Sequence, residues 1–323
     1  MRALACPASL KGVLGAPVAA AALAEGLRAG GSEARELPVA DGGEGTAEVL
    51  RLALGGEWRE ADVQDAFGRP RSARWLLLPD GTAVVEAAAA VPLDSERLDP
   101  LAASSRGFGE LVAAALAEEP AGLLLCLGGT ATMDAGLGLL EVVGELPVGA
   151  RVACDVTATL AEAPGVFGPQ KGAGPTEVAE LERRFAAREE LVVFQHESGA
   201  GAAGGLGAAL AFLGAKLLPG AALVLDAVGF DASGYDLVVT GEGRVDATTA
   251  LGKAPGEVAR RSVGTRCVVF GGVVDVEHPG VGVETIALSG DPTRAREDLV
   301  ELGRVLASNN YQDRDVGPRS GPL

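Results

Sequence analysis

Short apolar runs alternate with helical segments at both ends of the chain. The run RALACP at 2–7 precedes an Ala- and Leu-rich stretch that predicts a helix over about 16–28. EARELPV at 33–39 predicts a second strand, and a further helix is expected over about 45–54. The same rhythm returns near the C-terminus, where DLVVTGEG, RCVVFGGV and ETIAL predict strands. Strands and helices that alternate with short connections are typical of a parallel sheet covered by helices.

The middle of the chain follows a different rhythm. From about 57 to 92, the runs EWREADVQD, RSARWLLLP and TAVVEAA predict antiparallel strands joined by turns. A helix near 104–118, the buried run GLLLCLGG, a helix after Thr130 and a strand at ARVACDV are expected next. A charged surface helix is predicted over 176–190, and the uncharged segment 199–215 predicts a buried helix that is too short for a membrane span.

The simplest assembly is one α/β domain built from both ends of the chain, interrupted by a second α/β domain. We assign residues 1–58 and 230–323 to the discontinuous domain and residues 59–229 to the inserted domain, and we expect a frayed tail from Ser308 onward. Ligands of parallel α/β sheets bind at the carboxyl ends of the strands. Both SLKG and ADGGEG follow predicted strands, so the sequence predicts a site at that edge.

Composition and charge limit the classes of binding partner and the cellular compartment that we expect. The formal net charge of −17 argues against nucleic acids and anionic membranes. The four cysteines lie in or beside apolar runs without a metal-ligand spacing, which predicts buried thiols in a reducing compartment. No segment has the pattern of a signal peptide, so we expect a soluble, cytoplasmic protein. The sequence leaves a homo-oligomer open.

Five glycine-rich stretches that carry charged side chains are the candidate chemistry, and we expect each to follow a strand. They are SLKG (9–12), ADGGEGT (40–46), GGTATMDAG (128–136), FGPQKGAG (167–174) and TGEGRVD with GKAPG (240–256). Glycine-rich loops offer backbone N–H groups to phosphate oxygens, lysines add positive charge, and carboxylates hold Mg²⁺ or accept a hydroxyl proton. The combination predicts phosphoryl transfer, although the GxxxxGK[ST] motif of P-loop enzymes is absent.

Six motifs in a fixed order resemble those of bacterial glycerate kinases of the glycerate 2-kinase type. They are ADGGEGT, GGTATMDAGLG, ACDV, VFGPQKGA, GAGAAGGLGAAL and VVTGEGRVD with GKAP, within about residues 1–275. The resemblance implies a flavodoxin-like domain interrupted by an inserted α/β domain, with the active site in the cleft between them. It further implies transfer of the γ-phosphoryl group of ATP, with Mg²⁺, to D-glycerate, and it favours the 2-position.

Each motif contributes candidate site residues. We expect Asp41 to orient the hydroxyl or hold the metal together with Asp155, and Asp246 to act as general base from a loop. Lys11 and Lys253 are the candidate clamps for phosphate or carboxylate. The predicted substrate- or nucleotide-binding residues are Ser9, Gly42, Gly43, Glu44, Gly45, Gly129, Thr130, Asp134, Lys171, Glu242 and Arg244.

The chain departs from the family pattern at four places. Ala8 stands where the family has an aspartate, Met133 replaces an asparagine, and residues 157–159 replace an Asp-Asn pair. The turn at 105–109 also lacks the usual tyrosine and threonine. Two alternatives follow: a catalytically impaired relative that senses a nucleotide or small acid, and a kinase for another small hydroxy acid. The retained lysines and acids favour a working phosphotransferase.

Overall fold

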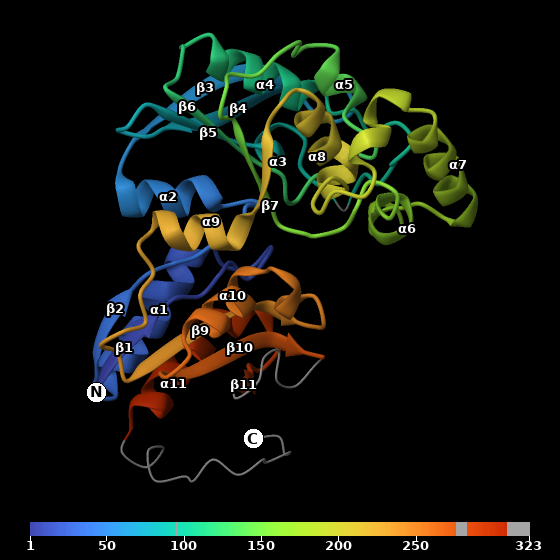
Figure 1. The fold of residues 1–323 in the computed structure, drawn as a ribbon. Helices are drawn as coiled ribbons and strands as arrows, with labels where there is room; N and C mark the ends of the chain where they lie inside the picture. Colours follow the sequence, from blue (N-terminus) through green and yellow to red (C-terminus); the bar gives the residue numbers. More distant parts are fainter. Residues whose placement is uncertain (95, 276–282, 309–323) are drawn as a thin grey trace. The chain divides into compact units, whose positions relative to one another are not determined.

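The computed structural model describes residues 1–94, 96–275 and 283–308, and Figure 1 shows the fold. The chain divides into two compact units, each with residues from separate parts of the sequence. The terminal unit comprises Met1–Pro38, Asp231–Asp246 and Val258–Leu323. The middle unit comprises Val39–Phe230 and Ala247–Glu257.

The terminal unit is built on a five-stranded sheet in which every pair of neighbouring strands is parallel. Its strands are β1 (Arg2–Ala5), β2 (Glu33–Glu36), β9 (Leu237–Val245), β10 (Arg266–Val274) and β11 (Glu284–Ala287). They lie in the order β11-β10-β9-β1-β2. Counted along this unit the order is 2-1-3-4-5, which is the flavodoxin-like order, so the predicted fold class is confirmed. The order reverses between β1 and β9, and the loops that follow these two strands therefore lie at the switch point where such sheets bind ligands.

Two long helices of the terminal unit pack unusually closely. They are α1 (Ala16–Ala29) and α11 (Ala295–Ala307), which follows a 3-10 turn at Pro292–Arg294. A Cβ atom at Gly26 would lie 1.9 Å from the carbonyl oxygen of Val300, and one at Gly303 would lie 2.4 Å from that of Leu23. Glycine therefore allows the two helix backbones to approach each other directly.

The middle unit is built on a six-stranded mixed sheet whose strands lie in chain order. The strands are β3 (Glu57–Gln64), β4 (Pro70–Leu77), β5 (Thr82–Glu86), β6 (Gly122–Cys126), β7 (Arg151–Cys154) and β8 (Lys216–Pro219). The first three are antiparallel, as predicted, and β5 to β8 are parallel. The four-residue strand β8 was not predicted, since its residues directly follow an apolar helix.

The described helices of the middle unit are mostly short. They are α2 (Thr46–Leu54), α3 (Ala87–Ala90), α4 (Arg106–Leu116), α5 (Leu137–Leu140), α6 (Ala163–Phe167), α7 (Pro175–Ala186), α8 (Ala202–Phe212) and α9 (Gly220–Ala227), with 3-10 turns at Pro169–Lys171, Glu189–Phe194 and Thr249–Leu251. Helix α10 (Ala254–Arg261) begins in this unit and ends in the terminal one. The buried-helix prediction for 199–215 is confirmed by α8, whose residues are buried up to Ala211. Within the described residues, no helix is long and apolar enough to cross a membrane.

Three sequence predictions differ from the structure. Residues 39–58 and 247–257 group with the middle unit, the first because α2 packs on β4, β5 and α9, whereas we assigned both segments to the terminal domain. The strand predicted from DLVVTGEG is confirmed as β9, but it continues to Val245, so Arg244, which we expected in the loop before Asp246, lies in the strand. The FGPQKGAG stretch begins at the last residue of α6, not after a strand. The predicted frayed tail falls outside the described residues apart from Ser308.

Candidate active site

The ADGGEGT loop of the middle unit is held against the ends of three parallel strands by close backbone contacts. A Cβ atom at Gly42, where φ is +91°, would lie 2.8 Å from Ala153 Cβ at the end of β7. A Cβ atom at Gly128, after β6, would lie 2.6 Å from Gly43 Cα, and one at Gly220, after β8, would lie 2.1 Å from the carbonyl oxygen of Asp41. The glycines are therefore required by close approach, which explains their density in this loop.

Two predicted metal ligands lie close to this contact. A Cβ atom at Gly128 would also lie 2.7 Å from Asp155 Oδ2, and Asp41 Oδ1 accepts a hydrogen bond of 3.3 Å from the Gly43 N–H. Burial is the main cause that raises the pKa of the nearby Cys126 thiol well above its ordinary value, and Glu86, Cys154 and then these two aspartates act in the same direction. Asp41 and Asp155 thus meet in one part of the middle unit. Within the described residues, no three His, Cys, Asp or Glu side chains are grouped to hold a metal ion by themselves.

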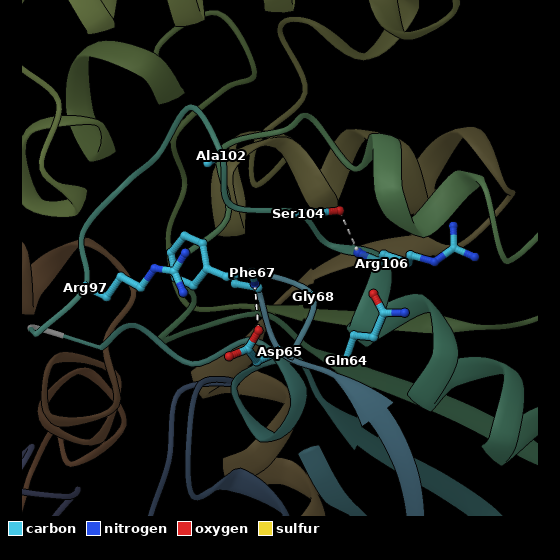
Figure 2. Close-up of a pocket in the computed structure, with 9 residues that line it drawn as sticks. Gln64, Asp65, Phe67, Gly68, Arg97, Ala102, Ser104 and Arg106 are labelled. Carbon is cyan, nitrogen blue, oxygen red and sulfur yellow. Dashed lines mark hydrogen bonds between the residues drawn. The ribbon is translucent and has the colours of Figure 1, made fainter. Parts of the chain in front are cut away.

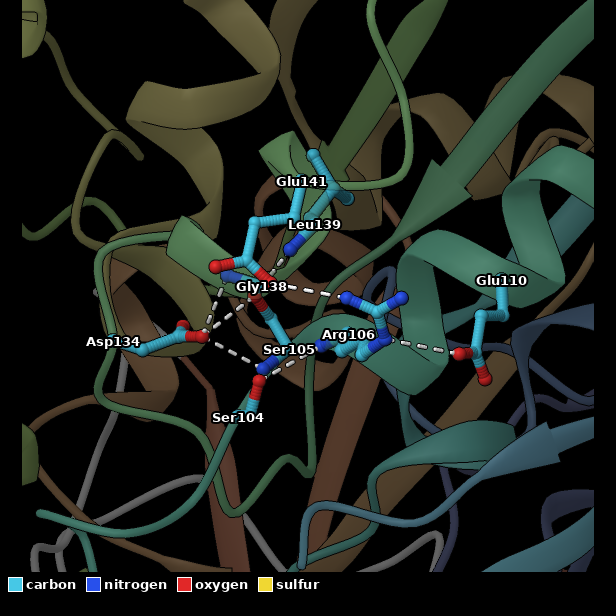
Figure 3. Close-up of polar contacts among 8 residues, drawn as sticks. All are labelled: Ser104, Ser105, Arg106, Glu110, Asp134, Gly138, Leu139 and Glu141. Atoms are coloured by element: carbon cyan, nitrogen blue, oxygen red, sulfur yellow. Dashed lines mark hydrogen bonds and ion pairs between the residues drawn. The ribbon is translucent and has the colours of Figure 1, made fainter. Parts of the chain in front are cut away.

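Asp134 organises the loop that precedes α5 (Figure 3). Its Oδ2 accepts hydrogen bonds from the Ser105 N–H at 2.7 Å, the Ser105 hydroxyl at 2.8 Å and the Gly138 N–H at 3.1 Å. Its Oδ1 accepts one from the Gly136 N–H at 3.1 Å, and Ser105 Oγ accepts another from Leu139. The carboxylate thereby joins the starts of α4 and α5. A direct nucleotide contact by Asp134, predicted from the sequence, remains a prediction.

Lys171 is a buried cation in the same unit. Its side chain is only 4% exposed, and Nζ donates a hydrogen bond of 2.8 Å to the carbonyl oxygen of Thr132. Burial lowers the pKa of this ammonium to about 8, although Asp155 and Asp134 act in the opposite direction. Lys171 therefore fixes the 128–136 loop and supplies positive charge close to the carboxylates.

Glu86, at the end of β5, was missed by the sequence predictions. Its Oε1 accepts a hydrogen bond of 2.6 Å from the Ala47 N–H, and its carboxylate also accepts one from the Gly45 N–H. Burial is the main cause that raises the pKa of Glu86 to about 7. The only sequence signal was an acid at the end of an apolar strand, directly before four alanines.

The remaining predicted residues lie mainly in the terminal unit. Ala8 N–H donates to the Gly241 carbonyl oxygen at 2.9 Å, so the loop carrying Ser9 and Lys11 runs beside β9. Glu242 and Arg244 lie within β9, and because side chains alternate along a strand they share one face. Asp246 follows the strand directly.

Two cations of the last glycine-rich stretch differ in their surroundings. Arg244 is exposed and forms an ion pair with Asp275. Lys253 directly precedes α10 and is partly buried. It belongs to the short segment 247–257 that groups with the middle unit.

A separate cavity of about 200 Å³ opens beside the β3–β4 turn of the middle unit (Figure 2). The guanidinium of Arg97 stacks over the Phe67 ring, 3.9 Å from its centroid. Asp65 Oδ1 accepts hydrogen bonds from the backbone of Phe67 and Arg69, which fixes the turn. None of the predicted site residues lines this cavity.

Comparison with known proteins identifies the family. A family model described as the glycerate kinase family matches residues 3–148 and 146–289. The chain belongs to the glycerate kinase family. By that membership it is a kinase, and the resemblance seen in the sequence motifs is confirmed.

Individual members of the family are similar over most of the chain. Glycerate 2-kinase of Escherichia coli (strain K12) is 37% identical over 309 residues, which cover 80% of this chain and 81% of the relative. Glycerate kinase of Bacillus subtilis (strain 168) is 38% identical over 312 residues, with the same two coverages of 80% and 81%. A crystal structure assigned as glycerate kinase 2 from Salmonella typhimurium LT2 has a TM-score of 0.75 and 32% identity, and covers 95% of this chain and 97% of that one.

The structure shows where three of the residues that depart from the family motifs lie in this glycerate kinase family member. Met133 is 1% exposed and packs in an apolar cluster with residues such as Leu160, so it serves the core. Ala8 is 8% exposed. Thr159 turns its hydroxyl and its N–H toward Glu162, both at 2.8 Å, and thereby stabilises the turn before α6.

Proposed function

We propose that this glycerate kinase family member catalyses the ATP-dependent phosphorylation of D-glycerate, with 2-phosphoglycerate as the product. The observation that supports this most strongly is the approach of Asp41 and Asp155 to the same glycine contact, Gly43 against Gly128. Two carboxylates at a glycine-lined strand edge suit a metal-bound triphosphate. The name of the Escherichia coli relative, glycerate 2-kinase, supports the choice of acceptor position.

The two carboxylates suit Mg²⁺, which needs few protein ligands, better than a metal ion whose ligands all come from the protein. Mg²⁺ is usually bound through one or two carboxylates, with phosphates and water completing an octahedron. Asp41 and Asp155 are such a pair, in a region without a larger group of ligands among the described side chains. When bound, the ion would neutralise charge on the phosphates. This matters in a chain whose net charge is −17.

The proposed reaction gives a role to each of the catalytic residues predicted from the motifs. Asp246 takes the proton of the acceptor hydroxyl, the hydroxyl oxygen forms a bond to the γ-phosphorus, and the bond from that phosphorus to the bridging oxygen of ADP breaks. Lys11 and Lys253 hold phosphate or carboxylate oxygens as point charges. Glu242 and Arg244 lie on β9, directly before the loop position of the base. The cleft between domains that the family resemblance implies stays a prediction.

A coupled assay tests the proposal. Purified protein is mixed with ATP, Mg²⁺ and D-glycerate, and ADP release is followed through pyruvate kinase and lactate dehydrogenase. In a separate reaction, enolase added without phosphoglycerate mutase consumes only the 2-phosphate and so identifies the phosphorylated hydroxyl. We expect turnover that needs glycerate, and Asp155→Asn should lower it about 10- to 100-fold. Asp65→Asn, which alters a surface turn away from the predicted site, is the matched control.

The two alternatives predict other results of the same assay. Turnover with a different small hydroxy acid but not with glycerate would reassign the acceptor. Calorimetric binding of ATP without any ADP release would favour the sensor. In that case Ala8→Asp, which restores the acid of the family motif, should raise turnover sharply if the missing carboxylate is the reason.

A further inference from the structure

Glu86 connects the end of β5 to the loop that carries Asp41 and Glu44. Its carboxylate accepts hydrogen bonds from the N–H groups of Gly45 and Ala47, which lie at the start of α2. The first N–H groups of a helix have no partner within the helix, and they carry the positive end of the helix dipole. An acid from a neighbouring strand therefore fills the position that an external anion takes at other helix N-termini.

We propose that Glu86 is a positioning residue: by capping α2 it fixes residues 41–45 and presents Asp41 and Glu44 to the metal and the acceptor. The proposal rests on the proposed function, because a positioned carboxylate needs a reaction to serve. It adds a residue that the sequence motifs did not indicate. Glu86 is not itself a catalytic residue in this account, since its carboxylate is bound to the backbone of the loop.

The same contacts assign a role to the glycine-rich loop. The N–H of Gly43 donates to Asp41 Oδ1, and the N–H of Thr46 donates to the Gly43 carbonyl oxygen. Together with the two N–H groups bound to Glu86, four donors of this loop are already used within the protein. These contacts fix the backbone around the two acids of the loop, Asp41 and Glu44.

Charged and titratable groups around Glu86 come from three elements. Glu44, on the loop, raises its pKa, and Arg74, on β4, lowers it. Cys126 lies opposite Glu86 in the register of β5 and β6. Burial outweighs these charges, so protonation of Glu86 falls within the range in which the kinase would be assayed. A pH profile is therefore an informative measurement.

Amide hydrogen exchange tests the structural part on the full chain. Glu86→Ala removes the acceptor, and exchange at Gly45 and Ala47, resolved by NMR, should become about fivefold faster, since a lost cap is worth roughly 1 kcal/mol. Glu86→Gln keeps one acceptor oxygen, so its exchange rates at Gly45 and Ala47 should lie between those of the wild type and of Glu86→Ala. Glu110→Ala is the matched control, because Glu110 accepts a 2.8 Å hydrogen bond from the backbone of Gln64 in the same unit. It should leave exchange at 45 and 47 unchanged.

Kinetics test the functional part. We expect Glu86→Ala to lower kcat about 10- to 100-fold and to raise the Mg²⁺ concentration for half-maximal rate, as for other residues that orient a metal ligand. The KM for ATP at saturating Mg²⁺ should change less than about threefold. Glu86→Gln should recover part of kcat and remove the change of rate with pH near 7. If Glu86→Ala does not fold, Glu86→Gln serves both measurements.

The two measurements separate the two proposals. Unchanged exchange at Gly45 and Ala47 would overturn the role of Glu86 even in an active enzyme. Kinetic losses as large in Glu110→Ala as in Glu86→Ala would overturn it as well, because the effect would then be general destabilisation. A wild-type protein that releases no ADP, yet shows the exchange difference between variants, would instead overturn the proposed function.

Discussion

Carboxylates of the candidate site differ in what their oxygen atoms already accept. Asp134 accepts four hydrogen bonds from the starts of α4 and α5, and Glu86 accepts two from the start of α2. Among the described residues, Asp41 accepts a single, long hydrogen bond of 3.3 Å within its own turn. Asp41 is therefore the better suited of these three to receive a metal ion, whereas the other two shape the loops around it.

Lys171 gives a prediction about stability and pH. Its pKa is about 8 in the folded protein and near 10.5 when exposed, so the folded state binds this proton less tightly than the unfolded state. Below pH 8 both states are protonated and the folded state carries the unfavourable charge. Stability should therefore rise from pH 8 to 10.5, by up to about 3 kcal/mol from this group.

The measurement for Lys171 compares the wild type with Lys171→Met. The methionine variant keeps an apolar chain but loses the titrating group and its hydrogen bond to Thr132. Urea unfolding of both proteins at several pH values between 7 and 10 gives the difference in free energy of unfolding. We expect this difference to move in favour of the wild type as the pH rises. A constant difference would mean that Lys171 has an ordinary pKa.

At the level of elements, the packing of the loops against one another gives a prediction for Gly128. An added Cβ would lie 2.6 Å from Gly43 Cα and 2.7 Å from Asp155 Oδ2, so Gly128→Ala must displace the ADGGEGT loop or Asp155. We expect a loss of about 1–3 kcal/mol in stability. Turnover at limiting Mg²⁺ should fall at least about tenfold.

Gly144 provides the control for Gly128. A Cβ atom there would meet no atom within 4 Å, and its φ is not in the left-handed region. Gly144→Ala should therefore leave both the free energy of unfolding and the Mg²⁺ dependence of the ADP-release assay unchanged. Equal behaviour of the two variants would show that the close contact at Gly128 is relieved without moving the site.

Helix packing in the terminal unit gives an independent test. Replacing a mid-helix glycine by alanine normally stabilises a helix by about 0.5–1 kcal/mol. At Gly26 the new methyl group would lie 1.9 Å from the Val300 carbonyl oxygen, and helix backbone cannot yield locally as a side chain does. We expect Gly26→Ala to destabilise the protein by about 3 kcal/mol, measured by urea unfolding.

Gly15, at the N-terminal end of the same helix, is the matched control. There the closest contact of a Cβ atom would be 3.7 Å, with Pro17 Cδ. Gly15→Ala should change the free energy of unfolding by less than about 1 kcal/mol. A stable Gly26→Ala protein would show that α1 and α11 can separate without loss.

The elements also show what the sequence pattern could and could not predict. Alternating strands and helices at both ends predicted the parallel sheet, and the uncharged segment predicted α8, because burial leaves a clear apolar pattern. The glycines of β9 suggested that a loop begins before Asp246, whereas this strand continues to Val245. They are needed there because the neighbouring strand lies close: a Cβ atom at Gly241 would lie 2.3 Å from the Phe270 carbonyl oxygen. Glu86 was missed because its partners are backbone N–H groups 39 and 41 residues away.

At the scale of the whole molecule, the candidate residues divide between the two units. The middle unit contains Asp41, Asp155 and Lys171, and the terminal unit contains Lys11 and Asp246. Two apolar clusters of the middle unit consist of residues from 61–217. An apolar cluster of the terminal unit combines residues from both ends of the chain, so this cluster is complete only when both ends are present.

This division predicts how a fragment of residues 39–230 behaves. Because it contains the whole six-stranded sheet and its clusters, we expect it to fold alone with a cooperative thermal transition in far-UV circular dichroism. It should also retain slow exchange at Gly45 and Ala47, since Glu86 is present. It should release no ADP, because Lys11 and Asp246 are missing. Turnover by this fragment would show that the terminal unit contributes no essential group to the reaction.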